Sequence, residues 1–215
     1  MDDPVRYPVL LDLRGAPCLV VGGGAVAGRK VDGLRASGAK VTVVAPEVGE
    51  VLSSLAALAE IIWQAGPYEP GLAADARWRF VVAATDDQGV NRQVVADATA
   101  AGVWANDAGD PSGGPAARPA VHREGPITVT VSTDGLSPAA AAWLRDQIPN
   151  LVGREHATLV ALLGEARKQA SRDGRDVPNA TWQAALDSGM LDLIRRGRIS
   201  EAKERLQACL SSSSD

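Results

Sequence analysis

The stretch Cys18-Leu-Val-Val-Gly-Gly-Gly-Ala-Val-Ala-Gly-Arg-Lys30 runs from a short apolar segment into three glycines and then into a segment that favours a helix. In this pattern Gly22 would allow a tight turn, and Gly24 would let the backbone approach a pyrophosphate. The small Ala27 would let the helix pack on the strand. Phosphates would lie at the helix N-terminus, where free N–H groups and the helix dipole favour anions. We therefore expect a nicotinamide dinucleotide here, with a glycine-rich turn that binds no ligand as the alternative.

Apolar runs alternate with helix-compatible segments over the first half of the chain. Because helices that alternate with short apolar strands cover both faces of a parallel sheet, this order predicts an α/β fold with a Rossmann-like, doubly wound parallel sheet. Strands are expected at Cys18–Val21, Val41–Val44, Ile61–Gln64, Arg79–Ala83 and Val103–Ala105, and helices at Ala25–Ser37, Glu50–Ala59 and Gln88–Ala101.

The pattern breaks at residues 108–117, Ala-Gly-Asp-Pro-Ser-Gly-Gly-Pro-Ala-Ala, a composition typical of a loop. We accordingly place an NAD-binding Rossmann-like domain at residues 1–116, a dimerisation and substrate segment at 117–150, and a small all-helical domain at 151–215.

The segment 117–150 contains the β-branched run Ile127–Val131 and, from Ser137-Pro138 onward, a helix with proline at its first position. Ile127–Val131 is the only strand that we expect in this segment, so it needs a pairing partner and a covering layer. A second copy of the chain can supply both, which predicts a homodimer.

Composition excludes several classes of protein. The net charge of −4 argues against nucleic acid as the main partner. No apolar run reaches the roughly 18 residues of a membrane span, and the N-terminus lacks a secretory signal, so we expect a cytoplasmic protein that does not bind membranes. Cys18 and Cys209 do not suggest a disulfide framework, and with only two histidines we expect no permanent metal site.

The end of the second expected strand bears on the choice of cofactor. An acidic residue commonly ends this strand and binds the adenosine ribose. Here Ala45 is followed by Pro46-Glu47, so Glu47 comes slightly late and could equally be an exposed loop glutamate. No arginine stands in this loop to meet a 2′-phosphate, which favours NAD over NADP.

Further segments carry a resemblance to a known family. They are Val9-Leu-Leu-Asp-Leu13, Val81-Val-Ala-Ala-Thr-Asp-Asp-Gln-Gly-Val-Asn91, Trp104-Ala-Asn-Asp107 and Thr130-Val-Ser-Thr-Asp-Gly-Leu-Ser-Pro138. With the glycine turn, they resemble the bifunctional precorrin-2 dehydrogenase and sirohydrochlorin ferrochelatase family, which forms the N-terminal module of sirohaem synthases. The resemblance covers nearly the whole chain. It implies a Rossmann-like domain, a dimerisation segment and a small helical domain in an intertwined homodimer.

The resemblance also implies an activity: NAD-dependent dehydrogenation of precorrin-2 to sirohydrochlorin, followed in many members by insertion of ferrous iron to give sirohaem. The glycine turn and the end of the second strand would bind the cofactor. Together with the glycine fingerprint, this assigns cofactor contacts to Gly22, Gly24, Ala25, Val26, Pro46 and Glu47.

The family's most important acidic residue matches Asp107, just after the fifth expected strand. Ligands of open α/β sheets bind beyond the carboxyl ends of the strands, where Asp107 could accept the proton lost in dehydrogenation. An aspartate that only caps its own loop is the alternative, and we expect Asp107 to contribute little to folding. The tetrapyrrole supplies four nitrogen ligands of its own, so iron insertion needs no metal cage in the protein.

The substrate of such an enzyme carries many carboxylates, which require hydrogen-bond donors. Asp134 departs from the family, which commonly has glycine there, and it adds a negative charge close to the expected site. Candidate substrate contacts are Arg118, His122, Arg123, Ser132, Thr133 and Arg145, each of which could instead be an ordinary surface or structural residue.

Two other functions remain open at this point. A regulatory NAD-sensing module would share the glycine turn and need no catalytic acid. A dehydrogenase of small hydroxy or amino acids would need a His/Asp or Lys constellation, which is not visible in the sequence.

Overall fold

The computed structural model describes residues 6–110 and 112–211. The first N-terminal residues, on which the expected lack of a secretory signal partly depends, lie outside this range. The chain forms two compact units, each described by itself below: Met1–Arg118 with Asp134–Ser137, and Pro119–Thr133 with Pro138–Asp215.

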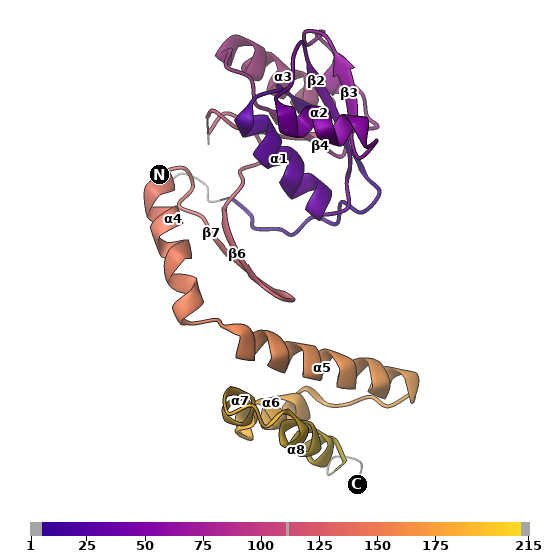
Figure 1. Ribbon diagram of the computed structural model, residues 1–215, viewed down its shortest axis with the longest axis vertical. Helices are drawn as coiled ribbons and strands as arrows, with labels where there is room; N and C mark the ends of the chain where they lie inside the picture. The colour runs from indigo at the N-terminus through magenta and orange to yellow at the C-terminus, as the bar shows by residue number, and fades with distance from the viewer. Residues whose placement is uncertain (1–5, 111, 212–215) are drawn as a thin grey trace. The chain divides into compact units, whose positions relative to one another are not determined.

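The first unit contains a five-stranded sheet in the order β3-β2-β1-β4-β5, in which all neighbours are parallel (Figure 1). The chain first builds outward from β1 to β3 and then crosses to β4 on the other side of β1. This reversal puts the topological switch point of the sheet between β1 and β4, and ligands of such sheets bind at the carboxyl ends of the strands there. The strand order confirms the doubly wound fold. The strands are β1 (Pro17–Val21), β2 (Lys40–Ala45), β3 (Ile62–Ala65), β4 (Phe80–Ala83) and β5 (Trp104–Asp107).

Helices cover both faces of this sheet. Alternate residues of β1 point to opposite faces: Cys18 and Val20 pack with α1 (Ala25–Ala36) and α2 (Glu50–Ala57). Leu19 and Val21 belong to the core under α3 (Gln88–Ala100) and the short 3-10 helix η1 (Leu72–Ala74). The central strand is therefore apolar throughout because both of its faces are buried.

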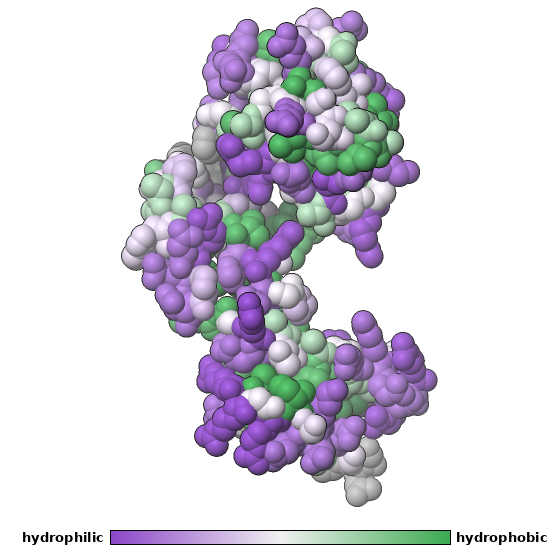
Figure 2. All heavy atoms as spheres, in the orientation of Figure 1, coloured by the Kyte–Doolittle hydropathy of each residue, from purple (hydrophilic) through white to green (hydrophobic). Residues whose placement is uncertain are grey.

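The edge strand β3 is more exposed. Figure 2 shows apolar surface over the part of the first unit where α2 and β3 lie, and Leu58 and Ile62 are exposed there. Trp63 of β3 donates a hydrogen bond from Nε1 to the carbonyl of Ala45 on β2 at 3.0 Å. This side-chain bond adds to the backbone pairing that holds the edge strand to β2.

The start of α3 explains the polar residues that follow β4. The Asp87 carboxylate accepts hydrogen bonds from the amides of Gly89 and Val90 and so caps the helix. The buried Asn91 binds Thr85 through both amide atoms: its Oδ1 accepts from the Thr85 amide at 3.0 Å, and its Nδ2 donates to the Thr85 carbonyl at 3.0 Å. Thr85, Asp87 and Asn91 therefore fix the geometry of the β4–α3 turn.

The second unit begins with a hairpin that corrects one prediction. β6 (Ala120–Glu124) pairs antiparallel with β7 (Ile127–Val131), and α4 (Pro138–Gln147) packs against both strands. The strand Ile127–Val131 thus has its pairing partner and covering helix within the same chain. We missed β6 because Ala120-Val-His-Arg-Glu124 has one β-branched residue and two charged ones. The unpaired-strand argument for a homodimer is therefore wrong, and the homodimer itself stays a prediction.

The rest of the second unit is helical, as predicted. Its buried core includes Leu159, Met190, Ile194 and Leu206, which come from three different helices. No helix among the described residues is long and apolar enough to cross a membrane. The elements are the 3-10 helix η2 (Ile148–Asn150) and the helices α5 (Arg154–Arg172), α6 (Asn179–Asp187), α7 (Met190–Arg195) and α8 (Ile199–Ser211).

Candidate functional site

Gly22 is required by the fold itself. Its φ of 125° lies in a region that residues with a side chain rarely adopt, and a Cβ at this position would overlap the backbone carbonyl of Ala84. The Gly22 amide also donates to the Val44 carbonyl at 2.9 Å. The glycine thus allows the ends of β1, β2 and β4 to approach one another.

Gly23 joins the glycine turn to the loop after β2, a role that sequence reasoning did not assign to it. A Cβ on Gly23 would overlap the carbonyl oxygen of Glu47, and the Gly49 amide donates to the Gly23 carbonyl at 2.9 Å. Pro46 and Glu47, both exposed, are thereby held beside the turn. No sequence signal could have revealed this contact, because the partner atoms belong to the backbone of a separate loop.

Gly24 differs from its two neighbours because a Cβ there would meet no atom of residues 6–110 and 112–211 within 4 Å. It is the N-cap residue of α1, has an ordinary φ of −80°, and offers no side chain to the amides of the first helical turn. Ala25 and Val26, which supply two of those amides, are exposed. The start of α1 therefore has accessible amide donors and open space above them, which fits a bound pyrophosphate.

The six residues that we predicted to bind the cofactor come together at one edge of the sheet. Gly22, Gly24, Ala25 and Val26 follow β1, and Pro46 and Glu47 follow its neighbour β2. The backbone bond between Gly23 and Gly49 connects the two groups.

Asp107 ends β5 and lies at the same edge. In the strand register Val21 pairs with Ala83, and Ala83 pairs with Asp107, so Asp107 is two strands from the glycine turn. That separation corresponds to about 10 Å across the sheet. Asp107 is the last residue of the strand itself, whereas we expected the strand to end at Ala105 and Asp107 to follow it.

The Asp107 carboxylate is buried and has a structural role. The residue is only 3% exposed. Its Oδ1 accepts hydrogen bonds from the amides of Gly109 at 2.8 Å and Asp110 at 3.2 Å, so it caps the turn that leaves β5. The expectation that Asp107 contributes little to folding is therefore wrong, because removing a buried acceptor leaves its donors without a partner.

Lys30 of α1 contacts the same turn, and sequence reasoning missed it. Its Nζ donates to the Oδ1 of Asn106 at 3.0 Å, and the Asn106 Nδ2 donates to the carbonyl of Ala116 at 3.1 Å. Helical spacing held a signal, because Lys30 lies three residues after the buried Ala27 and four before the buried Leu34. A lysine on the inward side of a helix needs a polar partner, and Asn106 is that partner.

The surroundings of Lys30 are positively charged. Burial lowers the pKa of the Lys30 amine, the charges of Arg118 and Arg29 lower it further, and Asp107 acts in the opposite direction. Arg118 lies across α1 at Gly33: a Cβ there would be 3.7 Å from its Nη2 and 3.8 Å from its Cζ and Nη1. These nearly equal distances place the face of the guanidinium against the helix.

Most of the predicted substrate contacts belong to the second unit, whereas Arg118 belongs to the first. His122 and Arg123 are neighbours on β6, so their side chains leave opposite faces of the hairpin and do not converge on one point. Among the described residues, the His122 Nε2 is buried without a hydrogen-bond partner. Arg145 on α4 pairs with Asp146 at 2.7 Å, and Ser132 and Thr133 directly follow β7.

The departure at Asp134 has a conformational explanation. Asp134 has a φ of 47°, and Gly135 after it has a φ of 85°. This left-handed region favours glycine, and aspartate is among the few other residues that tolerate it. Asp134 thus adopts a backbone conformation in which glycine is the usual residue.

No metal centre is evident in residues 6–110 and 112–211, where no three His, Cys, Asp or Glu side chains gather as ligands would.

The sheet order, the open glycine turn at the start of α1 and the polar residues at the carboxyl ends of the strands define a Rossmann-like dinucleotide-binding protein. Residues 9–120 match a family described as putative NAD(P)-binding, and the chain belongs to this family. Residues 124–151 match a second family, described as sirohaem biosynthesis protein central. These matches confirm the resemblance found in the sequence motifs.

Individual relatives agree with this assignment. The siroheme synthase of Chromobacterium violaceum is 34% identical over 204 residues, which cover 94% of this chain and 43% of that protein. The siroheme synthase of Nitrosococcus oceani is 34% identical over 205 residues, with the same coverage of 94% and 43%. The chain thus spans less than half the length of these curated relatives.

A solved structure is similar over almost its full length. The structure titled "SirC, precorrin-2 dehydrogenase" matches with a TM-score of 0.74 and 28% sequence identity, covering 94% of this chain and 98% of that one. The similarity thus includes both compact units of the chain.

Proposed function

We propose that this protein is a precorrin-2 dehydrogenase that uses NAD to form sirohydrochlorin. The observation that carries the proposal is the similarity to SirC, a precorrin-2 dehydrogenase, over 98% of that chain. The matches to the NAD(P)-binding family and to the central region of sirohaem biosynthesis proteins support it.

The open start of α1 is the part of the chain that would hold NAD. The amides of Ala25 and Val26 would donate to the pyrophosphate in the space above Gly24, and Pro46 and Glu47 would lie beside the adenosine ribose. Bound NAD would supply the hydride acceptor of the reaction. The exposed Glu47 and the lack of an arginine between Ala45 and Glu50 favour NAD over NADP.

Asp107 is our candidate for the proton acceptor. Conversion of precorrin-2 to sirohydrochlorin removes one hydride and one proton, so NADH and a proton are the other products. The Oδ1 of Asp107 already accepts two backbone amides, which leaves Oδ2 for the proton. Because Asp107 is 3% exposed, this role requires the backbone around Gly109 and Gly113 to shift when substrate binds.

Substrate carboxylates would need cationic and polar hydrogen-bond donors. We assign these contacts to Arg118, His122, Arg123, Ser132, Thr133 and Arg145.

A second step, insertion of ferrous iron into sirohydrochlorin, is proposed as well. The tetrapyrrole provides the four nitrogen ligands and releases two protons, for which Asp107 is again the candidate acceptor. The siroheme synthase relatives support this step. We also propose that the protein acts as a cytoplasmic homodimer.

Turnover tests the proposal directly. Purified protein, precorrin-2 and NAD should give NADH and sirohydrochlorin in equal amounts, followed by absorbance. A regulatory module would bind NAD without consuming precorrin-2, and a dehydrogenase of small hydroxy or amino acids would reduce NAD only with those substrates. Sirohydrochlorin and ferrous iron, supplied without NAD, would test iron insertion separately.

A further inference from the structure

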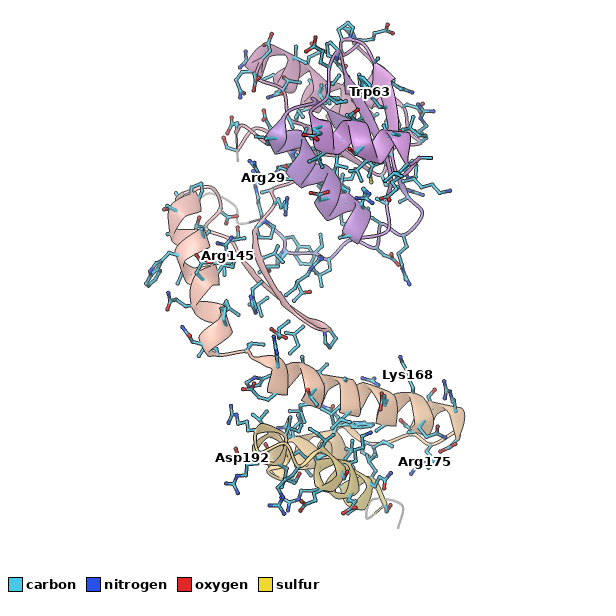
Figure 3. All side chains as sticks on the ribbon, viewed as in Figure 1. Arg29, Trp63, Arg145, Lys168, Arg175 and Asp192 are labelled. Carbon is cyan, nitrogen blue, oxygen red and sulfur yellow. The ribbon has the colours of Figure 1, made fainter. Side chains whose placement is uncertain are left out.

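Three cationic side chains lie near one another at α1: Arg29 and Lys30 of the helix itself, and Arg118 packed against it. They are here called the α1 cationic cluster, and Lys30 connects the cluster to the Asn106–Asp107 turn. Lys30 reaches Asn106, Arg118 lies across the helix at Gly33, and Arg29 projects outward from α1 (Figure 3). All three belong to the first unit, so their arrangement does not depend on the position of the second unit.

The cluster has no carboxylate partner of its own. Among residues 6–110 and 112–211, none of its three members forms an ion pair. Arg35, further along the same helix, pairs with Glu60 and Asp32. The charge of Asp107 raises the pKa of Lys30 and so favours its charged form. The Oδ1 of Asp107, however, already accepts hydrogen bonds from two backbone amides.

The positive charges of the cluster repel one another when no anion is bound between them. Partial burial first, and then the charges of Arg118 and Arg29, lower the pKa of Lys30, which means that each disfavours its charged form. A bound anion would relieve that repulsion. Within the described part of the chain, Lys30 uses one of its three N–H donors on Asn106 and keeps two, and the donors of both arginines have no partner there.

We propose that Arg29, Lys30 and Arg118 bind one carboxylate of the tetrapyrrole substrate beside the Asn106–Asp107 turn. The inference rests on the proposed function and adds Arg29 and Lys30 to the substrate contacts. It also gives Arg118 a defined role, because binding a carboxylate here would hold the substrate against the end of β5.

The position along α1 favours a substrate carboxylate over the cofactor pyrophosphate. Lys30 lies five residues after Ala25, or about 7.5 Å along the helix axis from the first turn. Arg118 contacts the helix at Gly33, about 12 Å from that turn. A pyrophosphate bound at the first-turn amides is therefore displaced from the centre of the cluster.

Single substitutions test the site. Lys30→Gln keeps an amide donor for Asn106 and removes the charge, and Arg118→Gln and Arg29→Gln remove the other two charges. Arg92→Gln, an exposed arginine on α3 in the same unit, is the matched control for loss of one positive charge. Each variant is assayed for KM and kcat with precorrin-2, for NAD affinity by calorimetry, and for sirohydrochlorin affinity by tetrapyrrole fluorescence.

We expect Lys30→Gln and Arg118→Gln to raise the KM for precorrin-2 and the Kd for sirohydrochlorin about tenfold or more. Arg29→Gln should raise them less because Arg29 projects outward from α1. Lys30→Arg should restore affinity. NAD affinity should stay within about twofold, and added salt should weaken substrate binding less in the variants than in the wild type.

The proposed function and the carboxylate site at the α1 cationic cluster would be contradicted by different results. If the wild type does not turn over precorrin-2, the proposed function fails, and the sirohydrochlorin titrations still decide whether the cluster binds a tetrapyrrole. If the wild type is active and the three variants match Arg92→Gln in KM and Kd, the cluster is a solvated surface and the inference is wrong. Weaker NAD binding with an unchanged KM for precorrin-2 would assign the cluster to the cofactor and also overturn the inference.

Discussion

The carbonyl oxygen of Ala84 lies where a side chain at Gly22 would begin, so the end of β4 closes directly over the glycine turn. A side chain at Gly24, two residues further along, would begin in a position where no atom of the described residues lies within 4 Å. The two glycines of this motif are therefore needed for different reasons. Gly22 allows the strand ends to approach each other, and Gly24 leaves room for a ligand. Substitutions at the two positions should have different consequences.

Gly24→Val should leave the fold intact and abolish NAD binding. The position has an ordinary φ of −80°, and a Cβ there would meet no atom of the described residues within 4 Å, so a side chain should be tolerated. The same side chain would occupy the space that a pyrophosphate needs. Calorimetry should show a loss of NAD affinity of about a hundredfold or more, with a thermal midpoint close to that of the wild type. Unchanged affinity would remove the glycine turn from the cofactor site.

Gly22→Ala should destabilise the protein with or without NAD. Its φ of 125° is strained for alanine, and the added Cβ would displace the Ala84 carbonyl at the end of β4. Strain of this kind costs about 2 kcal/mol or more. Urea unfolding without ligand measures the loss, and a Gly22→Ala protein as stable as the wild type would contradict the steric argument.

The sequence predicted the first unit well because its signals are local. The glycine turn, the alternation of apolar strands with helices, and the end of α1 near Ser37 each depend on neighbouring residues. The strand β6 was missed because its pairing with β7 compensates for weak intrinsic strand propensity.

The unpredicted parts of the site depend on contacts between distant segments. Gly23 is required by the Glu47 carbonyl, and Lys30 is held by Asn106, 76 residues away. Asp107 was predicted to lie at the carboxyl end of the fifth strand, although the strand extends two residues further than we expected. The burial of Asp107 was not predicted, because it depends on the chain that follows folding back over the strand end. Periodicity and motif spacing carry no information on such contacts.

The thiol of Cys18 should be unreactive in the folded protein. It is fully buried in β1, and this burial raises its pKa to about 11. The thiolate is the reactive form, so at neutral pH alkylation should require unfolding. Mass spectrometry after treatment with iodoacetamide should find Cys18 unmodified in buffer and modified in denaturant. Rapid native modification of Cys18 would show that β1 opens locally.

The bond between Tyr68 and Asp97 should stabilise the protein at neutral pH and lose this effect in acid. The Tyr68 hydroxyl donates to Asp97 at 2.6 Å and the Gly71 amide donates at 2.7 Å, which together lower the pKa of Asp97. A carboxyl whose pKa falls on folding adds stability above its unfolded pKa of about 3.9, and this stability disappears as pH falls through the folded value.

Tyr68→Phe should therefore cost about 1 kcal/mol at neutral pH, the net value of a typical hydrogen bond. Urea unfolding of the wild type and the variant should show this difference shrinking below about pH 4. A difference that does not change with pH would assign the contribution of Tyr68 to packing alone.

Asp107→Asn and Asp107→Ala should separate the chemical role of this residue from its role in folding. Asparagine keeps an oxygen that can accept the amides of Gly109 and Asp110, so its fold should be stable, but it cannot accept a proton. We expect the rate of precorrin-2 dehydrogenation to fall by about a hundredfold to ten-thousandfold in Asp107→Asn, whereas the affinity for NAD should not change. Asp107→Ala removes the acceptor as well and should also lower stability by about 1–3 kcal/mol. An Asp107→Asn protein that turns over precorrin-2 at the wild-type rate would restrict Asp107 to capping the turn after β5.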